Sequence, residues 1–315
     1  MSRRGETDGV YVELEELVAL RHHARRTTLL PQQPVRSLLA GRRTSKLRGR
    51  GLDFEELRAY VVGDDVRTID WRVTARAGKP YVRSYREERD RPVLLIIDQR
   101  PNMFFGSRRA MKSVVAARFG ALAAWRVNAV GDRVAALVIG EEQHWALSPG
   151  RSPSNVLRLL KLLVTAGARL GGAARASADT FGQALRAAPQ LVPHDALVVL
   201  VSDLRGLSED AVSALARIRR HNDLLVAWLV DPLETALPDV GLAQVTDGHA
   251  QLSLSTSDPE LRAAFEAAFA RDRERVTDLC RRSNAVLFEL RTDRDLVEQV
   301  EAVLGKRQAP VGRRA

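Results

Sequence analysis

The chain has 315 residues, of which 45% are hydrophobic and 28% charged, and its formal net charge is +10. This is the composition of a folded globular protein, and the length allows one large domain and a smaller one. No apolar run approaches the roughly 18 residues that span a bilayer, no apolar signal-peptide core follows Met1, and the single cysteine, Cys280, cannot form an internal disulfide, so we expect a cytoplasmic protein with no integral membrane segment.

The N-terminal region combines a predicted helix with a basic stretch. Apolar residues at helical spacing predict an amphipathic helix over residues 10–26, and residues 17–52 hold nine Lys or Arg side chains and no Asp or Glu. One alternative is therefore a nucleic-acid-binding regulator acting through residues 21–50, whose binding would weaken steeply with salt. The excess of 44 arginines over five lysines indicates that codon bias accounts for the basic stretch. An aromatic content of 5% leaves few rings on which bases could stack, which also argues against nucleic acid as a partner.

Short alternating segments and turn residues over 52–88 predict a small, mostly β module. Asp64, Asp65 and Asp70 lie close together there, beside Arg67 and Trp71, and these five are the candidate interaction residues of the module. A carboxylate- and metal-dependent hydrolase is a second alternative, but no histidine or lysine base lies near the carboxylates in sequence. We favour a turn stabilised by ion pairs for the carboxylates and a packing anchor for Trp71.

From Val93 onward, strand and helix patterns alternate. Strands are expected at 93–97, 133–139, 144–147, 197–201, 224–230 and 285–290. Helices are expected at 107–127, 154–165, 179–188, 209–221, 259–283 and 293–304. Continuous apolar strands separated by helices predict an α/β fold with a doubly wound, mostly parallel sheet.

Two of the apolar strands lead directly into carboxylates, Asp98 and Asp203. Open α/β sheets bind ligands at the carboxyl edge of the strands, so we expect the functional site there. Asp231-Pro232 follows another apolar strand, where a turn or helix cap is the favoured interpretation. No Gly-x-x-x-x-Gly-Lys-Ser/Thr phosphate loop occurs, which argues against nucleotide hydrolysis by this chain. Cys280, on a predicted helix, is expected to be a buried and inert thiol.

The segment from Gly51 to Trp71, GLDFEELRAYVVGDDVRTIDW, resembles the hallmark of the bacterial domain of unknown function 58 family. TAR at 74–76 and YREE at 85–88 continue the same pattern, and the resemblance extends over about residues 10–304. It implies a von Willebrand factor A-like, Rossmann-like doubly wound sheet with an N-terminal helix and a small β-rich module. Domains of that kind carry a metal-ion-dependent adhesion site built from an Asp-x-Ser-x-Ser loop, a Thr and an Asp, which suits magnesium or manganese.

Carried onto this chain, the resemblance gives a degenerate site. Its candidate metal ligands are Asp98, Asn102 in place of the second serine, Thr180 and Asp203, while Arg100 replaces the first serine. Arg100 could join Asp98 and Asp203 in an ion-pair network that needs no metal, or point outward and leave Asn102 as an oxygen ligand. The cofactor is therefore magnesium, manganese or none, and Arg100 is also a candidate interaction residue.

The resemblance also implies a function. Relatives of this kind are encoded beside MoxR-type AAA+ ATPases, so we expect a non-enzymatic adaptor that works with such an ATPase in the assembly or maturation of an unknown client protein. The expected domains are residues 1–92 with the helix, basic stretch and β-rich module, residues 93–304 with the von Willebrand factor A-like sheet, and a disordered tail at 305–315.

Overall fold

The computed structural model describes residues 9–24, 52–61, 66–87, 91–171, 179–246 and 251–304. The chain forms two compact units, a larger one of Met1–Val35 and Arg91–Ala315 and a smaller one of Arg36–Asp90. The expected tail at 305–315 and residues 25–50 of the basic stretch lie outside the described residues.

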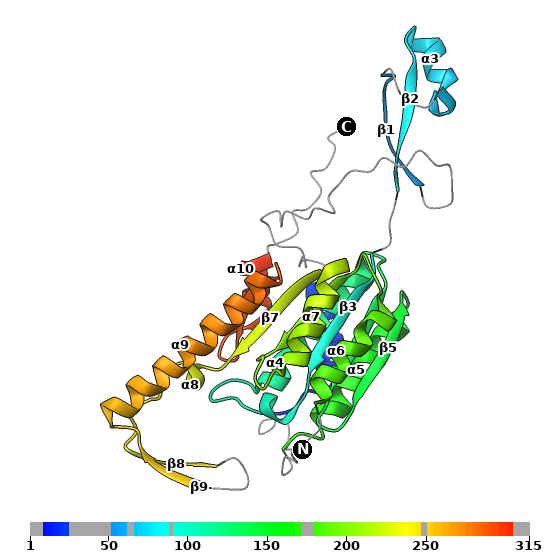
Figure 1. Cartoon of the computed structure of the whole chain (residues 1–315). Coiled ribbons are helices and arrows are strands. Elements are labelled where there is room, and N and C mark those ends of the chain that lie inside the picture. The colour runs from blue at the N-terminus through cyan, green and yellow to red at the C-terminus, as the bar shows by residue number, and fades with distance from the viewer. Residues whose placement is uncertain are drawn as a thin grey trace. The chain divides into compact units, whose positions relative to one another are not determined.

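In its described part, the larger unit is built on a six-stranded sheet with the order β10-β7-β6-β3-β4-β5 (Figure 1). The strands are β3 (Val93–Asp98), β4 (Val134–Ile139), β5 (His144–Gly150), β6 (Leu197–Ser202), β7 (Asp223–Val230) and β10 (Val286–Arg291). Neighbouring strands are parallel except β5, which is antiparallel to β4. This is the strand order of a Rossmann-like sheet with one antiparallel edge strand, which confirms the expected von Willebrand factor A-like fold.

The strands are apolar throughout because both faces of the sheet are covered. Along β3, Val93, Leu95 and Ile97 contribute to one core, whereas Leu94 and Ile96 contribute to the other. Successive side chains of a strand point to opposite faces, so one unbroken apolar run supplies both layers.

Helices form the two outer layers. The first face is covered by α4 (Lys112–Ala129), α5 (Pro153–Gly167) and α10 (Leu296–Leu304). The second face is covered by α6 (Thr180–Leu191), α7 (Glu209–His221) and α9 (Pro259–Arg282). Side chains from both layers therefore hold the strand ends in fixed positions, which is what a site at the sheet edge requires.

The N-terminal segment belongs to the larger unit, which corrects the expected boundary at residue 92. It forms two short helices, α1 (Leu14–Ala19) and α2 (Arg21–Ala24), where one helix was expected. Leu17 is fully buried in the core shared by α4 and α5, and Trp125 Nε1 donates a hydrogen bond to the Leu17 carbonyl over 3.0 Å. The burial of Leu17 accounts for the difference, because it joins the N-terminal segment to the core of the larger unit.

The smaller unit is a hairpin with a helix between its strands. β1 (Leu52–Ala59) pairs antiparallel with β2 (Tyr81–Glu87), and the connection contains the 3₁₀ turn η1 (Val66–Thr68) and α3 (Trp71–Ala77). Gly78 ends α3 in a left-handed conformation, φ +68°, which glycine adopts without steric cost. The β-rich module is thus present, with a helix that the sequence pattern did not predict.

Between β7 and α9 the chain forms elements that the sequence analysis also missed. They are the single turn α8 (Pro232–Thr235) and a hairpin of β8 (Leu242–Thr246) and β9 (Gln251–Ser255). Its strands are five residues each and half polar, so they lack the continuous apolar runs that mark the core strands. Among the described helices, none is both long enough and apolar enough to cross a membrane.

Candidate functional site

Four neighbouring parallel strands bring polar side chains to one edge of the sheet. β3 ends at Asp98, β6 is followed by Asp203, β7 by Asp231 and β10 by Thr292. Because β10, β7, β6 and β3 are adjacent in the sheet, these side chains follow one another along its carboxyl edge. The sequence analysis therefore correctly placed Asp98 and Asp203 at the carboxyl edge of one sheet. The contacts of each side chain decide which chemical role it can have.

The carboxylate of Asp98 is completely buried and is held by Arg100. Arg100 Nε and Nη2 donate to the two Asp98 oxygens over 3.0 and 2.8 Å, and the Arg100 backbone N–H donates over 3.1 Å. Ser202 Oγ adds a fourth hydrogen bond of 2.7 Å. Arg100 thus points inward, as the ion-pair interpretation expected, and forms the two-pronged pairing for which a guanidinium is suited.

The surroundings of Arg100 keep its guanidinium in place and charged. Its plane lies over the Phe181 ring at 4.4 Å, and Nη2 also donates to the Arg205 carbonyl over 3.2 Å. Burial on its own would lower the pKa of Arg100, but the charge and hydrogen bonds of Asp98, together with the charges of Asp203 and Asp179, outweigh it and raise the pKa above its usual value. Arg100 therefore keeps its positive charge beside Asp98.

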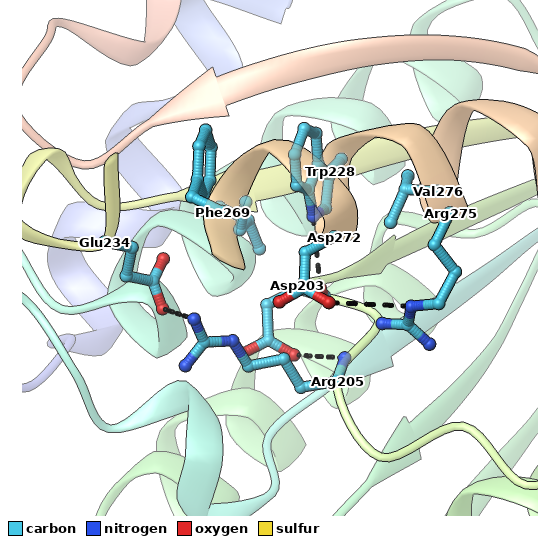
Figure 2. Close-up of a pocket in the computed structure, with 9 residues that line it drawn as sticks. Asp203, Arg205, Trp228, Glu234, Phe269, Asp272, Arg275 and Val276 are labelled. Carbon is cyan, nitrogen blue, oxygen red and sulfur yellow. Dashed lines mark hydrogen bonds and ion pairs between the residues drawn. The ribbon is translucent and has the colours of Figure 1, made fainter. Parts of the chain in front are cut away.

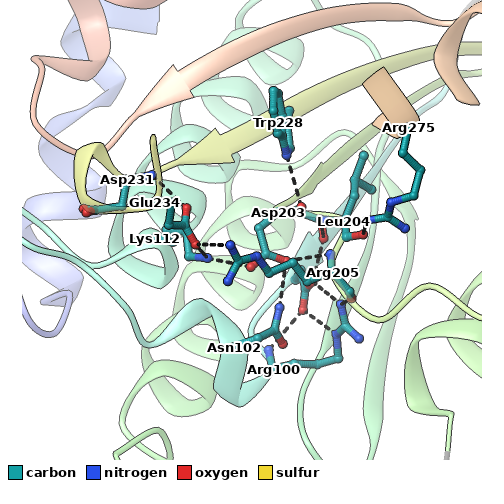
Figure 3. Close-up of polar contacts among 12 residues, drawn as sticks. Arg100, Asn102, Lys112, Asp203, Leu204, Arg205, Trp228, Asp231, Glu234 and Arg275 are labelled. Carbon is teal, nitrogen blue, oxygen red and sulfur yellow. Dashed lines mark hydrogen bonds and ion pairs between the residues drawn. The ribbon is translucent and has the colours of Figure 1, made fainter. Parts of the chain in front are cut away.

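Asp203 is held by two different side chains and not directly by Arg100. Asn102 Nδ2 donates to Asp203 Oδ1 over 2.7 Å, and Lys112 Nζ donates to Asp203 Oδ2 over 2.6 Å (Figure 3). The Arg205 backbone N–H adds a bond of 3.0 Å. Asn102 is therefore at the edge as predicted, with its amide nitrogen engaged by a carboxylate.

Lys112 is the residue that the sequence analysis missed. Its side chain is fully buried, and Nζ also donates to Glu234 Oε1 of α8 over 2.8 Å. An ammonium group at the first residue of a helix faces the positive end of the helix dipole, so the two carboxylates must compensate both that repulsion and the loss of hydration. A signal existed, because Lys112 is one of five lysines in a chain with 44 arginines and begins a long apolar helix.

Thr180 lies at the start of α6, and its hydroxyl is turned to the β4–β5 connection. Thr180 Oγ1 donates to the carbonyls of Gly140 and Glu141, each over 3.2 Å. The structure thus brings Asp98, Asn102 and Asp203 to the same part of the edge, while the two hydrogen bonds of Thr180 lead away from it.

The side chains as arranged do not fit a divalent cation. The described residues contain no group of three His, Cys, Asp or Glu side chains placed to hold one. Each carboxylate that a cation would need is already bonded to a positive group, Asp98 to Arg100 and Asp203 to Lys112. A divalent ion would have to displace both internal cations or bind beside them against their charge.

Asp231 closes the edge as a helix cap, as the sequence favoured. Its Oδ1 accepts from the Leu233 N–H over 2.9 Å, and Glu234 Oε2 accepts from the Asp231 N–H over 3.0 Å, which forms a capping box around α8. The hydroxyls of Ser107 and Thr292 also donate to it. Burial would raise the pKa of Asp231, but these hydrogen bonds outweigh it and lower the pKa below its usual value of 3.8.

A shallow pocket lies beside Asp203, between α8 and α9 (Figure 2). The rings of Trp228 and Phe269 stack at 5.9 Å, and Trp228 Nε1 donates to the Asp203 carbonyl over 3.1 Å. Arg205 and Arg275 stand at the pocket with side chains 50% and 47% exposed. These half-exposed arginines are the cations through which this part of the edge meets solvent.

The candidate residues of the smaller unit have structural roles or lie outside the description. Asp64 and Asp65 are not among the described residues, and Arg67 lies in η1 with an exposed side chain. Asp70 caps α3 by accepting from the N–H groups of Arg72 and Val73, which agrees with the structural role that we favoured. The expectation that Trp71 is a packing anchor is wrong, since it is 69% exposed on the first turn of α3.

Comparison with known proteins agrees with the fold. The profile of the family described as "Protein of unknown function DUF58" matches residues 56–275, and the chain belongs to that family. The chain is 28% identical over 285 residues to the uncharacterized protein Rv1480 of Mycobacterium tuberculosis, covering 89% of this chain and 87% of that protein. An uncharacterized protein of Mycobacterium avium is 30% identical over 105 residues, 33% of this chain and 62% of that protein.

Two solved structures align with the chain at low similarity. The conserved hypothetical protein BatB of Bacteroides thetaiotaomicron aligns with a TM-score of 0.41 and 13% identity, over 66% of this chain and 93% of that one. The SpRpn10 VWA domain aligns with a TM-score of 0.36 and 11% identity, over 70% of this chain and 99% of that one.

Removing the ammonium group of Lys112 tests the network. We expect Lys112→Met to lower the free energy of unfolding by about 3–5 kcal/mol, because it leaves Asp203 and Glu234 buried without their shared cation. Lys161→Met, at an exposed position on α5, is the control and should change the free energy of unfolding by less than about 0.5 kcal/mol. Urea unfolding followed by circular dichroism measures both, and equal effects would contradict a structural role for Lys112.

Replacement of the two internal cations, Arg100 and Lys112, should make the melting temperature depend on a divalent metal ion. We expect the melting temperature of the wild type to be the same in magnesium and in chelator. Arg100→Ser combined with Lys112→Ala frees Asp98 and Asp203, so magnesium or manganese should raise the melting temperature of this double variant. Adding Asp98→Ala to it should abolish the increase. A wild type that magnesium stabilises, with the effect lost in Asp98→Ala alone, would show that the native site binds metal.

The lowered pKa of Asp231 predicts how the free energy of unfolding depends on pH. A carboxylate with a depressed pKa stabilises the fold above its usual pKa, and this contribution is lost as the pH falls through the folded-state value. Asp231→Asn should therefore flatten the acid side of a plot of unfolding free energy against pH. Asp210→Asn, at a side chain that is 81% exposed, is the control and should leave the slope unchanged.

Proposed function

We propose that this protein is a non-enzymatic adaptor whose sheet edge docks an acidic partner surface. The observation that carries the proposal is that the edge carboxylates are neutralised from within the chain. Asp98 accepts four hydrogen bonds, three of them from Arg100, and Asp203 is bonded to Asn102, Lys112 and the Arg205 backbone. Carboxylates with these partners serve to fix a shape, whereas a general base must be free to take a proton.

Two of the groups that this edge offers to a partner are arginines, and the half-exposed carboxylate of Asp272 lies 3.7 Å from Arg275 Nε. Arg205 and Arg275 are about half exposed, and each is held by a further contact. Arg205 Nη2 lies 3.3 Å from Glu234 Oε1, and Arg275 Nη2 donates to the Leu204 carbonyl over 3.1 Å. Partly ordered arginines lose less side-chain freedom on binding and suit carboxylates on a partner.

The identity of the partner rests on the resemblance of the Gly51–Trp71 segment to proteins encoded beside MoxR-type AAA+ ATPases. We propose that such an ATPase, in the cytoplasm, supplies ATP hydrolysis, while this chain links it to a client protein during assembly or maturation. Membership of the family of unknown function 58 supports the comparison without naming a partner.

Neither alternative has a comparable observation in its favour. The hydrolase hypothesis relied on Asp70 as one of three acid–base carboxylates, yet Asp70 caps α3. The nucleic-acid hypothesis relies on residues 21–50, of which 25–50 lie outside the described residues.

The proposal is tested by affinity purification from native cytosol with ATP and magnesium, read by mass spectrometry. We expect the wild type to recover an AAA+ ATPase. The double variant Arg205→Glu and Arg275→Glu should recover at least tenfold less ATPase, because the carboxylates of the partner then meet like charges. Arg217→Glu, at an exposed position on α7, should retain the ATPase.

Recovery of no ATPase by the wild type would overturn the partner assignment. Equal recovery by the double variant and the control would show that the ATPase binds elsewhere on the chain. Recovery of nucleic acid with the wild type, lost with rising salt, would favour the regulator hypothesis.

A further inference from the structure

The outward face of α3, in the smaller unit, combines an exposed tryptophan with exposed cations. At the helical spacing of about 3.6 residues per turn, Trp71, Ala75, Arg72 and Arg76 lie on one continuous arc, and all four side chains are exposed. Lys79 follows the end of the helix and is exposed as well. Trp71 is 69% exposed, which leaves most of a large and mainly apolar ring in water.

The other side of α3 is fastened to the hairpin of β1 and β2. The Asp70 N–H donates to the Tyr81 carbonyl over 2.8 Å, and the Tyr81 N–H donates to Thr74 Oγ1 over 3.0 Å. Figure 1 shows α3 on one side of this hairpin. Because these bonds fix which side of the helix faces the strands, the tryptophan and the arginines are presented together on the other side.

The cations of this face have no anionic partner. The sequence of α3, WRVTARA, contains no Asp or Glu, and within the described part of the chain Arg72, Arg76 and Lys79 form no ion pair. Arg72 and Arg76 are four residues apart on one helix, where like charges repel. The two arginines of the sheet edge, by contrast, each have a carboxylate neighbour. The face of α3 is therefore a separate positive surface.

The charge of the whole smaller unit has the same sign. Residues 36–90, which form this unit, include 14 Lys or Arg and nine Asp or Glu. A net positive charge attracts an anionic surface over a longer range than the contacts of α3 alone.

We infer that the outward face of α3 binds the surface of a membrane that contains anionic lipids. Such a surface attracts each Lys or Arg that comes near it, and indole favours the boundary between lipid headgroups and hydrocarbon. The apolar stem of an arginine lies along hydrophobic surface while its guanidinium reaches a phosphate. A flat anionic surface contacts all of these groups at once, because they project from one convex helix face.

The exposed apolar side chains favour a membrane over nucleic acid. Val66, in η1 directly before α3, is 59% exposed, and an aliphatic side chain gains from contact with lipid but offers no ring on which a base stacks. Trp71 is the exposed one of four tryptophans, since Trp125 and Trp228 are buried and Trp145 is half-buried. A nucleic acid would therefore find a single stacking ring on the protein.

Co-sedimentation of the full chain with lipid vesicles tests this inference. The wild type should bind vesicles of equal parts phosphatidylglycerol and phosphatidylcholine, should not bind pure phosphatidylcholine, and should be released by added salt. Arg72→Gln with Arg76→Gln should weaken binding by about tenfold or more. Arg217→Gln with Arg220→Gln, at exposed positions on α7, removes the same charge from the larger unit and should leave binding unchanged.

Tryptophan fluorescence gives a second measurement that needs no charge variant. Anionic vesicles should shift the emission of the wild type to shorter wavelength and protect it from quenching by acrylamide, because Trp71 leaves water. Trp71→Phe should remove both changes, since the other three tryptophans are already covered by protein to a greater extent.

Equal binding to neutral and anionic vesicles, or equal loss of binding in the α3 and α7 variants, would overturn the inference. Vesicle binding without a change in Trp71 emission would also overturn it, because the lipid contact would then lie elsewhere on the chain. A single-stranded oligonucleotide that binds through Arg72 and Arg76, with no competition from anionic vesicles, would assign the face to nucleic acid. The inference is independent of the proposed function, in which α3 takes no part.

Discussion

The arrangement of the sheet edge depends on the buried ammonium group of Lys112. It lies between Asp203, which follows β6, and Glu234 of α8, and so connects α4, the central strands and the segment that leads to α9. Burial of three charges is tolerated because each has a close partner of opposite sign, and removal of any one would leave the others in a medium that solvates them poorly. The cation thereby performs in the structure the bridging that the resemblance assigned to a metal ion.

The same principle applies to Asp98. Arg100 satisfies both oxygens of Asp98 and is itself supported by the Phe181 ring. Both edge carboxylates therefore have fixed partners, and the shape of the edge is set by the chain alone. The half-exposed side chains beside this edge include Arg205, Arg275 and Asp272, and the two arginines are the groups through which we propose that it binds an acidic surface.

The sequence predicted those parts of the structure that depend on local pattern. Apolar runs identified β3 and β6, and the adjacency of these strands brought Asp98 and Asp203 to one edge. Lys112 was missed because its partners are 91 and 122 residues away, and no local pattern encodes such a pairing. The hairpin of β8 and β9 was missed because its strands are only five residues long and half polar, and Trp71 was misjudged because an aromatic side chain in a motif does not reveal which surface it faces.

The position of the smaller unit within the chain affects how the molecule responds to a protease. Both of its connections lead to the larger unit, after Val35 and before Arg91. A single cut between Val35 and Leu52 would leave the smaller unit joined at Arg91, while the N-terminal fragment would stay bound through Leu17 and the hydrogen bond from Trp125. Such a nicked chain would separate into two fragments in denaturant and remain one particle in native buffer.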